Sequence, residues 1–239
     1  MFHHTHAYLA SKLYKSEDTL LLIGSILPDL AITGSISWED GLHGGDNDAK
    51  FTSFIEEKYP EFLHLAKGVH AHNIVDDFTH IHYKGKIGYA FQNNKELVAL
   101  ISQFYELDDQ KAEGKAHNFI ESGVEIFLLL KNPEIQQSLK SATLQVDREK
   151  LSQILAEYFH KDPKNLQEAI NRYFELFTST DFSQKENWIT FWTELEKLMK
   201  LKPIGNGKRE QLLNKAQEIT KHNYHEFLEY SLIEGIRHT

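Results

Sequence analysis

The feature that most constrains the fold is the near-absence of segments in which apolar and polar residues alternate. Half-buried strands need such alternation, with a period of two residues. Here the apolar residues recur at helical spacing instead, most clearly towards the end of the chain, at Leu212, Leu213, Ala216, Ile219, Tyr224, Phe227 and Leu228. Only five prolines interrupt the 239 residues. The sequence therefore predicts an all-α fold.

The helical patterns can be placed approximately along the chain. The first two occupy HAYLASKLYK and LLLIGSIL, and a long one runs from about 51 to 83 with a break near Pro60. Two glycine-containing polar stretches, 33–50 and 84–94, are predicted to be loops. The remaining helices are expected at 95–105, 110–130, 147–160, 165–178, 184–200 and 208–236. Because no internal repeat or low-complexity linker is present, we expect a single domain over 1–239.

Composition excludes several classes of function. The net charge of −9 argues against a nucleic-acid-binding protein, so a nucleic acid is expected only as a substrate. The absence of cysteine excludes disulfides, thiolate metal sites and cysteine nucleophiles, and it fits a reducing cytosol. The chain has no apolar run of the roughly 18 residues needed to span a membrane, and its first residues do not resemble a secretory signal. A cytoplasmic location is therefore expected.

Ten of the fourteen histidines lie in the first 117 residues, and two of them are paired with carboxylates at helical spacing. His72 and Asp76 are four residues apart, as are His117 and Glu121. On a helix this spacing puts both side chains on one face, with β-carbons about 5–6 Å apart. Nitrogen and oxygen donors without thiolates favour Zn²⁺, Mn²⁺, Fe²⁺ or Ni²⁺. Each pair is thus a candidate for holding a divalent cation.

The surroundings of these pairs favour metal ligands over surface ion pairs. Both pairs border apolar stripes, where an unpartnered carboxylate is costly to bury. No lysine or arginine lies between Lys67 and Lys84 to form helix-surface ion pairs. Two loop residues add further candidates: Asp29 follows a proline at the end of an apolar run, and His43 lies in GLHGGD. For Asp29 a helix cap, and for His43 an ordinary loop imidazole, remain the alternatives.

Taken in order, PD at 28–29, His43, HxxxDxxxxxH at 72–82 and HxxxE at 117–121 resemble the zinc-dependent phospholipase C superfamily. That superfamily includes single-strand nucleases and 3′-nucleotidases. The resemblance covers about residues 1–125, whereas 134–239 is similar only in helical character. It implies a single-domain multi-helix bundle with a cluster of zinc ions in a cleft.

The resemblance also implies which residues hold the metals. The first ion would be held by Asp29, His43, His72 and Asp76. The second would be held by His82, His117 and Glu121, with Asp76 bridging towards a third. His80 competes with His82 because it lies four residues beyond Asp76, and the resemblance favours His82.

A third ion is held in secreted members by the amino group of a processed N-terminus and a nearby histidine. His6 is the closest match to that histidine, and His3 or His4 would have to replace the amine. The start at Met1 departs from the secreted pattern. The expected cofactor is therefore two or three Zn²⁺ ions, with other divalent metals as alternatives.

The activity implied is a zinc-dependent hydrolase of phosphoric esters, similar to a phosphodiesterase or phospholipase C. Two cations would activate water and bind phosphate oxygens, and Asp29 would orient or deprotonate the water. The expected substrate is a small phosphoester or a phospholipid, with candidate apolar residues at the pocket mouth being Phe2, Trp38 and Phe51. The alternative is a metal-binding helical protein without catalysis. A di-iron bundle would need two Glu-x-x-His motifs and further glutamates on facing helices; it is disfavoured, although Glu-x-x-His does occur at 61–64.

Overall fold

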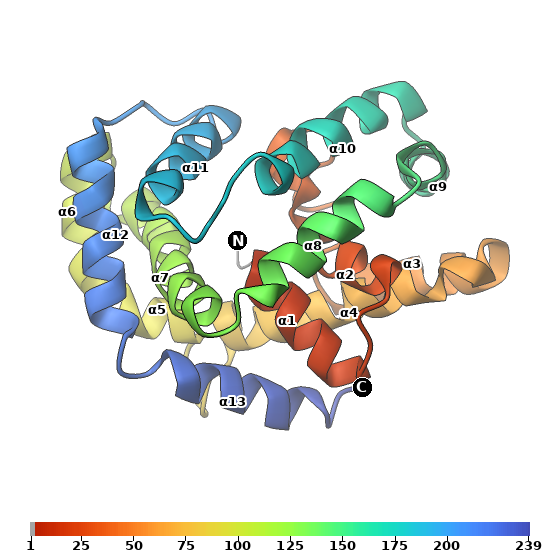
Figure 1. Cartoon of the computed structure of the whole chain (residues 1–239), viewed down its shortest axis with the longest axis horizontal. Helices are drawn as coiled ribbons and strands as arrows, with labels where there is room; N and C mark the ends of the chain where they lie inside the picture. Colours follow the sequence, from red (N-terminus) through yellow and green to blue (C-terminus); the bar gives the residue numbers. More distant parts are fainter. Residues whose placement is uncertain (1–2) are drawn as a thin grey trace. The chain divides into compact units, whose positions relative to one another are not determined.

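The computed structural model describes residues 3–239, and its secondary structure is helical throughout (Figure 1). Within this range no strand forms, apart from an isolated bridge between Tyr83 and Lys86. The all-α prediction is therefore confirmed. None of the helices in the described range combines the length and the apolar character that crossing a membrane requires.

The chain divides into two compact units. Unit 1 comprises residues 3–5, 74–133 and 182–238, and unit 2 comprises 6–73 and 134–181. The boundary falls inside two helices, α1 (His3–Tyr14) and α4 (Leu63–Asp76). The single domain expected from the sequence stays a prediction, because two compact units can belong to one folding domain.

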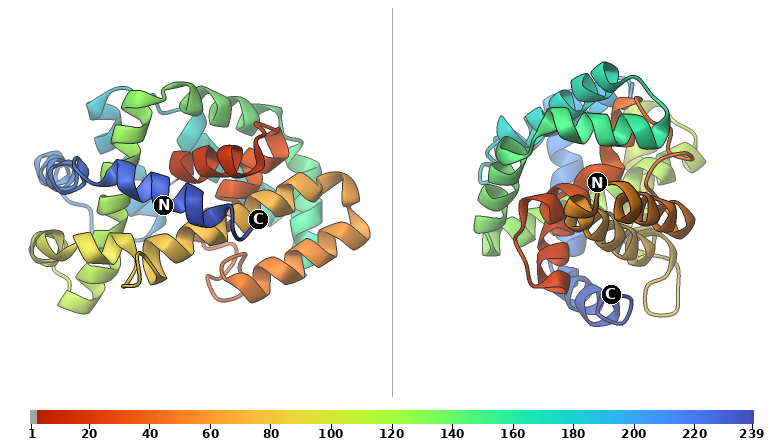
Figure 2. Two further views of the ribbon diagram at one scale, coloured as in Figure 1. Left: turned by 90° about the horizontal axis from the view of Figure 1, so that it is seen from below. Right: turned by 90° about the vertical axis from the view of Figure 1, so that its right-hand side faces the viewer.

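Unit 2 contains most of α1 and α4 and the helices between and after them. These are α2 (Thr19–Ile26), the 3-10 helix η1 (Leu27–Thr33), α3 (Gly45–Lys58), the short η2 (Pro60–Phe62), α8 (Glu134–Gln145), α9 (Arg148–Phe159) and α10 (Pro163–Thr178). The right-hand view of Figure 2 shows α8, α9 and α10, coloured green to teal, lying together, with α10 in contact with both others.

Unit 1 is built around α7 (Asp109–Lys131), which packs against α6 (Lys95–Tyr105) and α12 (Asn206–Thr220) (Figure 1). Its other elements are the π-helical turn η3 (Asp77–Ile81), α5 (Tyr89–Asn93), α11 (Lys185–Leu198) and α13 (Tyr224–Gly235). In its core the rings of Phe119 and Trp192 stack at 3.8 Å.

Aspartate side chains begin four of the helices. Asp18 accepts hydrogen bonds from the backbone N–H groups of the first turn of α2. Asp108, Asp147 and Asp162 do the same for α7, α9 and α10. Each carboxylate satisfies donors that have no partner within the helix and places negative charge at its positive end.

Two glycines let α2 and α4 approach closely within unit 2. A Cβ atom on Gly68 would lie 2.3 Å from the carbonyl oxygen of Leu21, and one on Gly24 would lie 2.1 Å from that of Leu65. No other residue fits at either position without separating the two backbones. This crossing brings the end of α2 next to the histidine-bearing part of α4.

Several predicted boundaries differ from the observed ones. The loop expected over 33–50 ends early, because GDNDAK forms the first turns of α3. The long helix predicted for 51–83 is interrupted after Lys58, as expected near Pro60, and its last turn is the π turn η3. The helix predicted for 208–236 breaks between Thr220 and Tyr224. Helix α8 was not placed by the sequence patterns.

Candidate metal centres

Three of the expected ligands meet within unit 2, and we call them cluster A: Asp29, His43 and His72. Each offers one ligand atom, and these atoms all lie within 4.8 Å of one another. Asp29 comes from η1, His43 from the loop before α3, and His72 from α4. The Nε2 atom of His43 is 3.5 Å from Oδ1 of Asp29. Asp29 and His72 are buried.

The orientation of His72 is fixed by the backbone of α2. Its Nδ1 atom lies 2.8 Å from the carbonyl oxygen of Ser25. A carbonyl only accepts hydrogen bonds, so Nδ1 carries the proton and Nε2 presents a lone pair. Histidines that bind metals typically donate their other N–H group to a carbonyl or carboxylate in this way. The contact depends on the close crossing at Gly24 and Gly68.

His6, the residue expected near a third metal, lies against cluster A by its ring. Its imidazole stacks on that of His72, with centroids 3.8 Å apart and planes 18° apart. Both rings are fully buried. The structure therefore brings His6 next to a cluster residue, and its role as a ligand stays a prediction.

A second group of ligand types meets within unit 1, and we call it cluster B: His80, His117 and Glu121. Their ligand atoms also lie within 4.8 Å of one another. Nε2 of His80 is 2.9 Å from Oε1 of Glu121, and Nε2 of His117 is 3.9 Å from the same oxygen. Glu121 is fully buried on α7, one turn after His117, so the two side chains lie on the same face of this helix, as predicted from their spacing.

The charge states in cluster B suit a cation. Burial lowers the pKa of His117 to about 4, so its imidazole is neutral at pH 7. Burial opposes ionisation of Glu121, but the surrounding positive charge and the hydrogen bond from His80 lower its pKa to about 2. Nδ1 of His117 is buried and makes no hydrogen bond with the described residues. The Glu121 carboxylate and the neutral His117 imidazole are donors of the kind that divalent transition metals prefer, whereas His80, whose pKa is raised, must lose a proton before it can bind one.

Asp76 lies beside His80 at the end of α4. Its Oδ1 atom is 3.7 Å from Nδ1 of His80. Burial lowers the pKa of His80, but the charge of Asp76 and the bond to Glu121 outweigh it, so that this pKa is raised. Asp76 also stands four residues after His72 on α4, as the sequence indicated.

His82, expected as a ligand with His117 and Glu121, is not brought to them. Its side chain is 73% exposed and lies 3.3 Å from Asp77. The preference for His82 over His80 is therefore corrected: His80 occupies the place beside Glu121. The reason is the π turn, closed by the hydrogen bond from His82 N to Asp77 O, after which the chain leaves the helix in an extended conformation.

The other histidines near the start of the chain belong to the core of unit 1. The backbone N–H and Nδ1 of His4 both lie within hydrogen-bond distance of Glu125 Oε1, the latter at 2.6 Å. The ring of His3 meets that of Phe191 edge-on at 6.3 Å. Glu125 is buried and was not singled out from the sequence. Its position four residues after Glu121 was the only available signal.

Of the two described residues expected at the pocket mouth, Trp38 fits and Phe51 does not. Its side chain is 51% exposed, and its ring lies 4.9 Å from that of His43. Phe51 is fully buried, where it packs edge-on against Tyr158, so it cannot contact a substrate. Phe2 lies outside the described residues.

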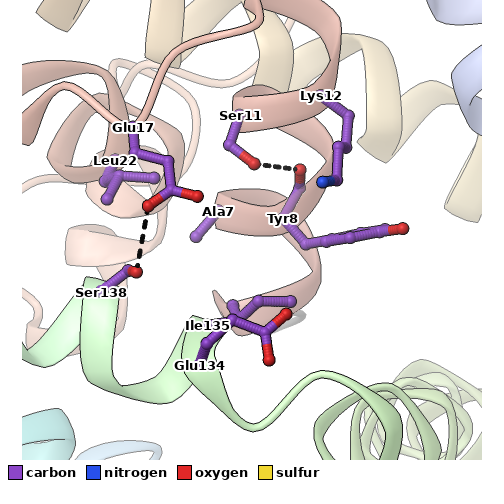
Figure 3. A pocket seen from close by; sticks show the side chains of 9 residues that line it. All are labelled: Ala7, Tyr8, Ser11, Lys12, Glu17, Leu22, Glu134, Ile135 and Ser138. Atoms are coloured by element: carbon purple, nitrogen blue, oxygen red, sulfur yellow. Dashed lines mark hydrogen bonds between the residues drawn. The ribbon is translucent and has the colours of Figure 1, made fainter.

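Two hollows in unit 2 contain no residue of cluster A. A small cavity of about 30 Å³ between α1, α2 and α8 has room for water but not for a larger ligand (Figure 3). A groove of about 580 Å³ between α3 and α4 is lined by Tyr14, Lys67 and the pair His70–Asp48, whose Nδ1 and Oδ2 atoms are 2.5 Å apart.

No protein-family model, curated protein or solved structure matches this chain.

Proposed function

We propose that the protein is a metal-dependent hydrolase of phosphoric esters, with divalent cations, Zn²⁺ first among them, at clusters A and B. The observation that supports this proposal is that each unit contains a group of histidines and a carboxylate whose ligand atoms lie within 4.8 Å of one another. Three protein ligands leave coordination positions open for water or substrate, which is typical of catalytic zinc sites.

The donor sets fit the proposed metal. Cluster A offers two imidazoles and a carboxylate, and so does cluster B. Catalytic zinc sites use two histidines and a carboxylate in the same way. When bound, such cations lower the pKa of water and polarise phosphoryl oxygens. The two clusters account for two ions, and a third near His3, His4 or His6 stays a prediction.

The residues of the chain supply the remaining functions. Asp29 is buried beside His43, so its carboxylate can orient a water molecule or accept its proton. His72 is held by its hydrogen bond to Ser25, which leaves the lone pair of the ring on Nε2. Trp38 provides an exposed ring next to His43, where an apolar or flat part of a substrate can rest. The substrate class proposed is a small phosphoester or a phospholipid, with nucleotides included.

The test begins with the metal content of protein purified without added metal, measured by mass spectrometry. We expect close to two equivalents of zinc or another divalent metal. Hydrolysis of bis(p-nitrophenyl) phosphate should be lost on chelation and restored by Zn²⁺. His72→Ala and His117→Ala should each lose metal and activity, whereas His222→Ala, at an exposed position, should keep both.

Two outcomes would contradict the proposal in different ways. Full metal content in both His72→Ala and His117→Ala would reject the clusters as metal sites. Metal binding with no hydrolysis across phospholipid, nucleotide and aryl phosphate substrates would leave a non-catalytic metal-binding protein.

A further inference from the structure

A tight hairpin follows η3 and returns the chain to His80. Lys84 and Gly85 form its tip, both with positive φ, at 51° and 72°. Tyr83 and Lys86 exchange backbone hydrogen bonds of 3.0 Å across the turn. Two consecutive residues with positive φ are typical of the type I′ turn that joins the two arms of a two-residue hairpin. The hairpin therefore folds straight back towards η3.

Gly88, at the end of this hairpin, lies directly on the backbone of His80. A Cβ atom at position 88 would be 2.2 Å from the carbonyl carbon of His80 and 2.4 Å from its Cα and N atoms. The φ of Gly88 is −51°, which any residue adopts, so space alone requires glycine here. Any side chain at this position would displace the π turn that carries His80.

Helix α5 starts after Gly88 and brings Phe91 against both histidines of cluster B. The ring of Phe91 is 5.2 Å from that of His117 and 6.1 Å from that of His80. The two imidazoles are themselves 5.0 Å apart and nearly perpendicular, at 77°. One aromatic side chain thus limits the rotation of two candidate ligands.

Helix α5 is held in place by contacts with other residues of unit 1. Tyr89 is buried, stacks on Phe227 at 4.4 Å and donates its hydroxyl hydrogen to Asn223 at 2.7 Å. Asn223 also contacts Asn93 at the end of α5. Because α5 is held at both ends, it provides a rigid surface for the rings of cluster B.

We propose that Gly88 and Phe91 are positioning residues for cluster B. Gly88 allows the contact that sets the backbone of His80, and Phe91 holds the imidazoles of His80 and His117 towards Glu121. This inference rests on the proposed metal binding of cluster B. Residues that orient metal ligands typically contribute about 10- to 100-fold to metal affinity.

The experiment compares Gly88→Ala and Phe91→Ala with Gly85→Ala in a His43→Ala background, in which cluster A is disabled. Gly85 is in the same hairpin, and a Cβ there meets nothing within 4 Å, so this control has no clash; its φ of 72° adds a backbone strain that Gly88→Ala does not have. Co²⁺ affinity is measured by calorimetry and by its visible absorption. Ring nitrogen signals of the metal-free proteins are followed by NMR, and folding is checked by circular dichroism.

We expect Gly88→Ala and Phe91→Ala to weaken Co²⁺ binding about 10- to 100-fold. Their ring signals should move for His80 and His117 and not for His72. Gly85→Ala should keep both the affinity and the ring signals. Unchanged affinity and unchanged ring signals in Gly88→Ala and Phe91→Ala would overturn the inference.

The remaining outcomes are also decisive. If Gly88→Ala does not fold, Phe91→Ala carries the same test, since its ring contacts are made by a side chain alone. If the His43→Ala protein binds no Co²⁺, the metal function of cluster B fails. In that case the ring signals of the metal-free proteins still show whether Gly88 and Phe91 position His80.

Discussion

At the scale of single residues, one backbone carbonyl decides which nitrogen of His72 is available to a ligand. The carbonyl oxygen of Ser25 accepts a hydrogen bond from Nδ1, so Nδ1 carries the proton and Nε2 carries the lone pair that can bind a metal. The spacing of His72 and Asp76 indicated a ligand, because side-chain periodicity is visible in a sequence. The Ser25 contact was not predictable, because every residue has a backbone carbonyl and the sequence does not show which one accepts a hydrogen bond.

Tyr14 provides a prediction about alkaline pH. Burial, together with the charge of Asp48, raises its pKa to about 12, above the usual value near 10. Between these values the unfolded chain loses the proton while the folded chain keeps it, so stability falls as pH rises. We expect Tyr14→Phe to lose less stability than the wild type from pH 10 to 12, measured as the midpoint of thermal unfolding. Parallel curves for the two proteins would show that Tyr14 titrates normally.

The buried ion pair between Arg209 and Glu196 provides a second prediction. The guanidinium donates two hydrogen bonds to the carboxylate, at 2.9 and 2.5 Å, and Tyr105 donates a third at 2.7 Å. Removing one partner leaves a buried charge, so Arg209→Met should cost about 3–5 kcal/mol in urea unfolding. Lys197→Met breaks only an exposed pair with Glu194 and should cost at most about 1 kcal/mol. Similar costs for both variants would contradict this account.

At the scale of elements, the close crossing of α2 and α4 predicts that Gly68, which lies in it, and Gly114, which lies in an open position elsewhere, respond to alanine in opposite ways. Gly68→Ala puts a methyl group 2.3 Å from Leu21 O and should cost about 3 kcal/mol, near the upper end for overpacking. It should also weaken metal binding at cluster A, because the contact between Ser25 and His72 needs the close crossing. Gly114→Ala, in an open position on α7, should stabilise by about 0.5–1 kcal/mol. Thermal unfolding measures the stability of each variant, and metal analysis measures its metal content. Equal effects of Gly68→Ala and Gly114→Ala would contradict the role assigned to the crossing.

Helix positions were largely predictable, and helix ends were not. Apolar periodicity located α6, α7, α9 and α10 within a few residues, since each buries one face. The π turn after Asp76 was missed, because it depends on an i to i+5 hydrogen bond that residue types do not reveal. That single turn explains why His80 rather than His82 stands beside Glu121.

At the scale of the whole molecule, each unit contains all three residues of its own cluster. Cluster A uses no residue of unit 1, and cluster B none of unit 2. We therefore expect the two metal equivalents to be lost separately: one in His72→Ala, the other in His117→Ala, and both in the double variant. Metal analysis with calorimetric titration measures this. A single mutation that removes both equivalents would show that binding at the two clusters is coupled.

The candidate site was predictable in its ligand types and in most of their grouping. Three of the four residues that the resemblance assigned to the first ion, Asp29, His43 and His72, have ligand atoms within 4.8 Å of one another. His117 and Glu121 are likewise together, because both lie on one face of α7. What required coordinates was the third member of cluster B and the stacking of His6 on His72.

The distribution of tryptophans makes the protein its own optical probe. Of the three tryptophans in the sequence, Trp188 and Trp192 are buried in unit 1, whereas Trp38 is half exposed in unit 2 beside His43. The long-wavelength side of the intrinsic fluorescence therefore belongs mainly to Trp38. Co²⁺ or Ni²⁺ arriving at cluster A should quench that side selectively, and Trp38→Phe should abolish the change while metal content stays constant. The filling of cluster A can then be followed separately from that of cluster B without a label.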